Sequence, residues 1–265
     1  MSPDEWEVLT KTIRVIGNQN IARRFIETTG PFGPGCQTVP VETIHSITEG
    51  YKSISGSERS SITTGTRTSG IIPIISKDFV LHWRDIDEAR MNGKGLPLAK
   101  AVAAASICAR SEEKLILFGH TPLGYTGIMN AEGRNIATGF RWNSPGNAFN
   151  NFTLIIQMLM SKGHNGPFAS IVHPHIFAGL HRVLKGSPLL EISHIKALLT
   201  AGIFKSSLLA PRTGVVVSIG KQNLELVISV DTSAAFLGAK RMNLPFRVFK
   251  AVYLRILKSD AICTF

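Results

Sequence analysis

The stretch that decides the fold is PLAKAVAAASICARSEEKLILFG, residues 97–119. Its apolar side chains recur every three or four positions from Leu98 to Ile116, so they share one face of a helix. Pro97 suits a first helical turn and Gly119 suits a helix end. The pattern predicts one helix of about 22 residues, roughly 33 Å long at 1.5 Å per residue. Because the stripe is rich in alanine, neighbouring backbone can approach closely, and the helix can form the spine of an extended domain.

Downstream of this spine helix, helical and strand-like segments alternate. The periodicities predict helices over 147–163, 175–186 and 188–202, and buried strands over 168–174, 214–220 and 224–230. The closing RVFKAVYLRILKSDAICTF, residues 247–265, predicts strands that return to the core. The expected fold class is therefore α+β, with a mixed domain inserted after the long helix.

Upstream, the sequence predicts an amphipathic helix followed by a polar arm. Trp6, Leu9, Ile13 and Ile16 have the spacing of one helical stripe. GPFGPG, residues 30–35, then stops the helical segment with two Gly-Pro steps. Residues 39–75 join a Ser- and Thr-rich tip to β-type flanks, which indicates two strands of a long hairpin. A disordered linker is the alternative for the tip.

Composition limits the class of protein. Lys and Arg outnumber Asp and Glu by 29 to 18, so an acidic partner such as nucleic acid is compatible with the net charge of +11. Cys36, Cys108 and Cys263 are odd in number and form no CxxC pair, which argues against a disulfide framework or a zinc site. The first residues lack a leader pattern, and FTLIIQMLM is shorter than the roughly 18 residues that span a bilayer. We expect a cytoplasmic protein.

The sequence contains weak candidates for chemistry. His173, His175 and His181 lie in HPHIFAGLH, residues 173–181, with His164 and His194 nearby in sequence. Residues 173–181 contain no carboxylate or thiolate, so we expect no metal site. GxSxG, GxxxxGK[ST] and HExxH are absent, and we expect no enzyme.

Residues 83–88 contain two further candidates for chemistry. Asp85, Asp87 and Glu88 are acids early in a helix, where they commonly offset its dipole. Trp83 could stack a planar ligand such as a flavin, and a core or interface tryptophan is the alternative. We expect no other cofactor.

Taken in order, these segments resemble the encapsulin shell proteins, a family with the Hong Kong 97-type fold of tailed-phage major capsid proteins. The resemblance is carried by residues 22–35, 72–130, 162–192 and 224–239 together with the aromatic C-terminus. It implies an N-terminal helical segment at 1–38, an extended loop hairpin at 39–75 and a peripheral domain with the spine helix at 76–124. An axial domain at 125–229 and a return to the peripheral domain at 230–265 complete the implied division.

The resemblance also implies two sites. In this family, the N-terminal helix and the peripheral domain form a groove for the targeting peptide of a cargo protein. By position, the groove residues are Ile13, Ile16, Arg23, Phe25, Glu27, Asp231 and Ser233. A mixture of ionic and apolar groups suits an extended peptide. The implied fivefold pore loop comprises Lys185, Gly186, Ser187 and Pro188, and a ring of Lys185 side chains would favour anions.

The function implied is that of a non-catalytic shell protein that assembles into an icosahedral compartment around a cargo enzyme. Ferritin-like iron oxidases and dye-decolourising peroxidases are the cargo classes of the family, so iron storage is one role to expect. About sixty copies make the simplest closed icosahedron. The alternative is a viral or proviral capsid protein, for which the positive charge would hold nucleic acid. A protease or bacteriolytic enzyme is a third class, and no residue constellation supports it.

Overall fold

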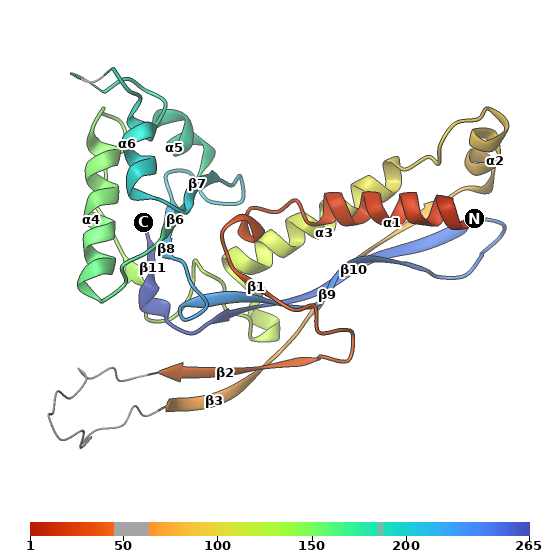
Figure 1. Ribbon diagram of the computed structural model, residues 1–265, viewed down its shortest axis with the longest axis horizontal. Coiled ribbons are helices and arrows are strands. Elements are labelled where there is room, and N and C mark those ends of the chain that lie inside the picture. The colour runs from red at the N-terminus through yellow and green to blue at the C-terminus, as the bar shows by residue number, and fades with distance from the viewer. Residues whose placement is uncertain (45–63, 185, 187) are drawn as a thin grey trace, which may run out of the picture.

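The computed structural model describes residues 1–44, 64–184, 186 and 188–265. Figure 1 shows an elongated region built on α1, α3, β9 and β10, a mixed region around α4, α5 and α6, and a hairpin of β2 and β3 that starts below β9 and runs toward the side of the mixed region. The termini lie in different regions, with the N-terminus at the far end of the elongated one. The expected α+β class is confirmed, since helices and sheets occur in both regions.

The elongated region is a sheet covered on one face by two helices. Among the described residues, its strand order is β1 (Thr28–Thr29), β9 (Leu224–Phe236), β10 (Leu244–Ile256) and β4 (Ile74–Leu81). Helix α3 (Ala99–Phe118) packs on β4 and β10, and α1 (Pro3–Gly17) packs on α3 and β9. The short α2 (Trp83–Met91) follows β4 at the end that also carries the β9–β10 turn.

Both sequence-predicted helices of this region are confirmed. Ser2 caps α1 in a reciprocal capping box with Glu5, and Leu9 and Ile13 are buried beneath the helix. In α3 the buried stripe is largely alanine, which allows α1 and the sheet to approach closely. One member of the buried face, Glu112, was not expected there because a charged side chain usually belongs to the solvated face.

The arm is a hairpin, as predicted for its flanks. Strands β2 (Thr38–Ile44) and β3 (Thr64–Ile71) pair antiparallel, with Thr38 opposite Ile71. Residues 45–63, the polar tip, lie outside the described residues. The predicted end of the arm at residue 75 falls inside β4, because the chain enters the sheet directly after Pro73.

The mixed region packs α4 (Asn147–Ser161), α5 (Pro174–Gly179) and α6 (Glu191–Leu198) around a second sheet. Within the described ranges this sheet has the order β5 (Asn135–Ile136), β11 (Ile262–Thr264), β8 (Gly214–Ser218), β6 (Phe168–Val172) and β7 (Gly202–Lys205). Strands β6 and β8 are buried throughout, as their continuous apolar runs predict.

Four local expectations were wrong. The segment after Asn18 forms only the 3₁₀ turn η1 (Ala22–Arg24), and the helix predicted over 175–186 shortens to α5. Residues 224–229 belong to β9 and thus to the first sheet, and the C-terminal β11 pairs with β8 in the second sheet instead of returning to the first. Apolar runs identify strands but carry no information on which sheet they join. The division into domains at 38, 75, 124 and 229 otherwise stays a prediction.

Candidate functional site

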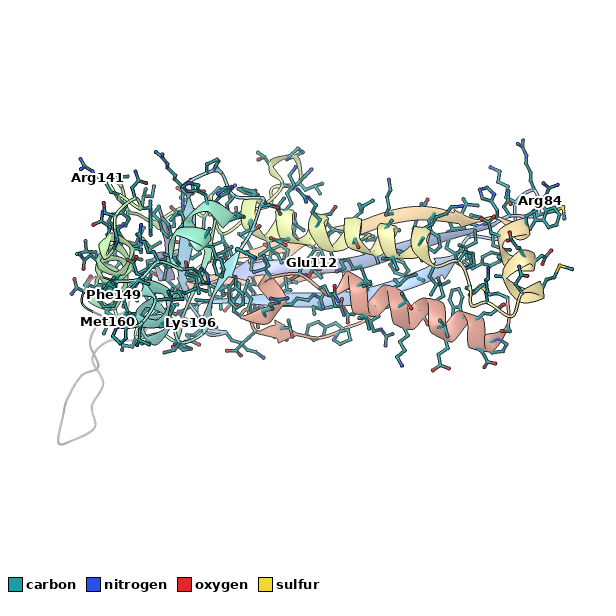
Figure 2. All side chains as sticks on the ribbon, turned by 90° about the horizontal axis from the view of Figure 1, so that it is seen from above. Arg84, Glu112, Arg141, Phe149, Met160 and Lys196 are labelled. Atoms are coloured by element: carbon teal, nitrogen blue, oxygen red, sulfur yellow. The ribbon has the colours of Figure 1, made fainter. Side chains whose placement is uncertain are left out.

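A network of four charged side chains lies where the end of α1 meets α3 and the first sheet. Glu112 of α3 and Lys250 of β10 form an ion pair, and neither side chain is exposed. Arg23 donates from Nε to Oε1 of Glu112 and from Nη1 to Oδ1 of Asp231, each at 2.9 Å. Lys250 Nζ also donates to the carbonyl oxygen of Gly17 at 2.6 Å. The network therefore fixes the end of α1 to the body of the molecule (Figure 2 labels Glu112 at its centre).

Two members of this network, Lys250 and Asp231, have shifted pKa values. Burial lowers the pKa of Lys250, and the neighbouring carboxylate opposes that shift. Burial is the largest single influence and would raise the pKa of Asp231, but the charge of Arg23 and the hydrogen bonds from the Thr232 N–H, the Asn18 amide and Arg23 together outweigh it. The pKa of Asp231 is therefore lowered. Two cations and two anions balance, so the network carries no net charge.

Two of the expected groove residues belong to the core. Ile13 has no exposed surface and lies among the apolar side chains between α1, α3 and the sheet. Phe25 is buried and its ring stacks on Phe204 with 5.3 Å between the centroids. Neither side chain has the exposed surface that lining a groove would need, and for Ile13 the reason is that the helical stripe that could face a ligand is the stripe that faces the core.

The remaining expected groove residues lie at or near the surface. Arg23, Asp231 and Ser233 come together, and Ser233 Oγ donates to the Asp231 carbonyl oxygen at 2.9 Å. Ile16 is half-buried on α1, and Glu27 is exposed just before β1. The assignment of these five residues to a groove stays a prediction.

An apolar pocket beside the start of α1 was missed by sequence reasoning. It has a volume of about 380 Å³ and is lined by Met1, Ser2, Pro3, Trp6, Phe236, Leu244 and Phe246. The Phe246 ring lies 5.9 Å from that of Trp6 and 5.4 Å from that of Phe236, between centroids. The available signal was the aromatic character of three segments that are far apart in the chain, and only the fold brings them together.

The stem of the predicted pore loop is well fixed. Val183 and Leu190 form a β-bridge, and Arg182 Nε donates to Oε2 of the buried Glu191 at 2.7 Å. The other oxygen of Glu191 accepts from the backbone N–H groups of residues 146 and 149 at the start of α4, each at 3.1 Å. Gly186 has a φ of 84° at the loop's turn.

The pore assignment itself is not tested by this geometry. Of the predicted loop residues, Gly186 and Pro188 are described, and Lys185 and Ser187 lie outside the described residues. The predicted ring of Lys185 side chains stays a prediction.

Trp83 is the first residue of α2, with 37% of its surface exposed and the Arg84 guanidinium 5.5 Å from its ring centre. Flavin stacking at Trp83 stays a prediction. Asp85 lies 3.6 Å from Lys100 and Asp87 lies 3.9 Å from Arg90, in surface ion pairs.

Neither a metal cluster nor a membrane span is found in the described residues. In that part of the chain, no group of three or more His, Cys, Asp and Glu side chains could hold a metal ion. Nor does any helix there have the length and apolar character to cross a bilayer.

Comparisons with known proteins place this geometry in context. A family model described as encapsulating protein for peroxidase matches residues 1–253. The chain is 40% identical over 98% of its length to the type 1 encapsulin shell protein EncA of Myxococcus xanthus, of which it covers 92%. It is 30% identical over its whole length to a diheme-cytochrome-encapsulin shell fusion protein of Kuenenia stuttgartiensis, of which it covers 73%.

Solved structures share the fold at low sequence identity. A virus-like particle protein from Pyrococcus furiosus superposes with a TM-score of 0.79 at 20% identity, and the match covers 98% of each chain. The capsid protein of the Myoviridae phage XM1 superposes with a TM-score of 0.69 at 13% identity, covering 92% of this chain and 90% of that one. The same architecture thus occurs in a virus-like particle and in a phage capsid.

Proposed function

The chain belongs to the encapsulin shell-protein family, and we propose that about sixty copies of it close into an icosahedral compartment around a cargo enzyme. The observation that carries this proposal is the 40% identity to a shell protein across nearly the full length of both chains. We infer that the chain performs no catalysis and that its role is to assemble into a shell and to enclose the cargo enzyme. We also propose that the shell resides in the cytoplasm.

A redox enzyme is the proposed cargo. The matching family model is described by encapsulation of a peroxidase, and two relatives are fusions of a shell with a diheme cytochrome and with a ferritin-like protein. We propose a peroxidase or a ferritin-like protein for this shell, with iron storage as the role in the second case.

The cargo's targeting peptide is proposed to lie along the seam between α1 and β9. Asp231 contacts Asn18 at the end of α1, and Phe236 lies in the apolar pocket with Trp6 near its start. The five residue steps from Asp231 to Phe236 span roughly 17 Å of strand, enough for a short extended peptide. Within this seam the pocket would take an apolar side chain and the Asp231 end would take polar ones.

The peptide's charge preference follows from the network. Arg23 is already paired with Glu112 and Asp231, so its charge is not free for a ligand. Glu27 is exposed just before β1, which pairs with β9 at Leu226, five residues before Asp231. A peptide that continued past Asp231 in this direction would therefore meet an acidic side chain, which favours a cationic residue there.

The test is electron microscopy of particles purified from the native cell, followed by peptide mass spectrometry of the proteins that co-purify with them. Uniform shells that contain a second protein would support the proposal and identify the cargo. Soluble monomers or dimers at high protein concentration would contradict it.

The alternative function, a capsid protein that packages nucleic acid, is supported by the distribution of positive charge along the chain. Residues 125–223 contain nine Lys or Arg residues and two acidic ones, so most of the net charge of +11 lies on the mixed region. A polyanion would find this surface favourable. Purified particles with a high ratio of nucleic-acid absorbance to protein absorbance would favour this alternative. The nucleic acid should then be digested by nuclease only after the particles are opened.

A further inference from the structure

The mixed region contains a pocket that the function proposed above does not explain. It has a volume of about 350 Å³ and lies among the loop before α4, helix α5 and the chain that follows α5. Part of its lining is apolar and part can donate hydrogen bonds. The apolar wall is formed by Trp142, Ile176 and Leu180, and the polar side is formed by Asn143, His175 and Arg182. A concave site that combines an apolar wall with a few polar groups is typical of small-molecule binding.

Arg182 on the polar side is fixed in position and keeps unused donors. Its Nε donates to Oε2 of Glu191 at 2.7 Å, and within the described ranges this is the only hydrogen bond of the guanidinium. The Nη2 nitrogen is buried without a partner. A guanidinium donor that lacks an acceptor is costly, and a side chain that is already held loses little entropy on binding. Arg182 is therefore preorganised to accept an additional oxygen ligand.

Glu191 neutralises the charge of Arg182 only in part. The Glu191 side chain has no exposed surface. Its second oxygen accepts from the backbone N–H groups of residues 146 and 149 at the start of α4. These N–H groups, at the positive end of the helix dipole, offset part of the carboxylate charge. A positive potential therefore remains at the pocket.

The chain around the pocket is basic. Residues 133–224 contain a single acidic residue, Glu191. The exposed Arg141 precedes Trp142 of the wall, and Figure 2 labels Arg141 at one edge of the mixed region. Lys205 of β7 lies 5.4 Å from the centre of the Phe177 ring on α5. Because no acidic residue is among the described residues that line the pocket, an anion meets attraction there without a matching repulsion.

We propose that this pocket binds a small organic anion. Its carboxylate or phosphate group contacts Arg182 and His175, and its apolar body packs against the apolar wall. The volume falls within the roughly 300–1,000 Å³ of small-molecule pockets and is more than an inorganic ion fills. An anion with an apolar body uses both sides of the lining. This ligand site goes beyond the proposed shell function and depends neither on assembly nor on the cargo.

Isothermal titration calorimetry of the full-length chain tests the class of ligand. Phenyl phosphate has both an oxyanion and an apolar body, inorganic phosphate lacks the body, and benzyl alcohol lacks the charge. We expect phenyl phosphate to bind several-fold more tightly than inorganic phosphate, and benzyl alcohol not to bind. Benzoate binding more tightly than phenyl phosphate would identify a carboxylate ligand, and the reverse order would identify a phosphate ligand. Equal affinities for phenyl phosphate and inorganic phosphate, or no binding of any probe at millimolar concentration, would overturn the proposal.

Two substitutions test whether the probe binds in the pocket. Ala178→Phe fills the pocket from α5 and is expected to abolish measurable binding of phenyl phosphate. Arg182→Lys keeps a positive charge beside Glu191 but loses the planar fork, and is expected to weaken binding about tenfold, as loss of one charge-assisted hydrogen bond does. Ala197→Phe makes the first change at an exposed position of α6 outside the lining, and should bind like the wild type. Unchanged binding in Ala178→Phe, or equal weakening in Ala197→Phe, would overturn the site.

The ligand site and the shell function can fail separately. Binding is measured on dissociated subunits and on assembled particles, with circular dichroism to verify that each variant is folded. Closed shells that do not bind phenyl phosphate would contradict the ligand site alone. A chain that binds phenyl phosphate but forms no shells would contradict the proposed function alone.

Discussion

Lys250 and Glu112 are ion-paired at a point where neither side chain reaches solvent, and Arg23 holds the second oxygen of the carboxylate. Burying such a pair costs desolvation of both ions, and removing one partner leaves the other charge uncompensated. Lys250→Met is therefore expected to lower the free energy of unfolding by about 3–5 kcal/mol, measured by urea denaturation of dissociated subunits. In the double variant Lys250→Met/Glu112→Leu the loss should be clearly smaller. Equal losses of unfolding free energy in both variants would show that Lys250 stabilises the fold through packing and not through charge pairing.

The pair of Glu5 and Arg90 connects the start of α1 to α2 through two parallel hydrogen bonds of 2.9 and 2.8 Å. These bonds are the largest cause of a Glu5 pKa lowered from 4.5 to about 2. Because the folded pKa is depressed, the stabilisation is complete above the ordinary pKa of 4.5 and is lost as the pH falls toward 2. An NMR titration of the Glu5 carboxyl should show the low value, and Arg90→Ala should return it toward 4.5. An unchanged titration in Arg90→Ala would refute the assignment.

Gly70 at the root of the hairpin lies directly against the Tyr253 ring. A β-carbon at this position would stand 2.2 Å from Cζ of Tyr253, so Gly70→Ala must displace either the hairpin or the ring. We expect a large loss of closed shells in electron micrographs, with the subunits still folded by circular dichroism. Removing the ring in Gly70→Ala/Tyr253→Ala should recover part of the assembly. Gly35→Ala, where a β-carbon meets open space, is the matched control.

Phe236 and Leu237 are equally exposed neighbours, but only Phe236 lines the apolar pocket with Trp6. If the pocket receives a cargo-peptide side chain, Phe236→Ser should reduce the cargo per shell several-fold and leave the shells intact. Shells of the Leu237→Ser variant should contain as much cargo as wild-type shells. Cargo content is measured by quantitative mass spectrometry of purified particles, and equal loading in both variants would place the peptide elsewhere.

The spine helix and the hairpin strands were predictable because their patterns are local. The stripe from Leu98 to Ile116 has a helical period, and the flanks of the arm have β-type composition. In contrast, the burial of Glu112 depends on Lys250 and Arg23, which are distant in sequence and become partners only in the folded chain.

Sequence position anticipated the grouping of only some of the candidate groove residues, and the groove itself stays a prediction. Arg23, Asp231 and Ser233 come together, whereas Ile13 proved to be core, since the helical stripe alone does not distinguish a core from a ligand. The pocket around Trp6 depends on β9 and β10 pairing in a register that places Phe236 opposite Phe246. Periodicity cannot supply that register. The three-residue strand β11 is too short for its sheet partner to be inferred.

The two sheets described above are linked by more than one passage of the chain, which crosses between them after α3, after β8 and after β10. A single apolar cluster also contains Leu226 and Val252 of the first sheet together with Ile171 and Val217 of the second. Because several linkages surround a shared core, we expect the two sheets to move as one rigid unit. The curvature of an assembled particle must then be set at the margins of that unit, by the angle of the hairpin and the fit of its edges.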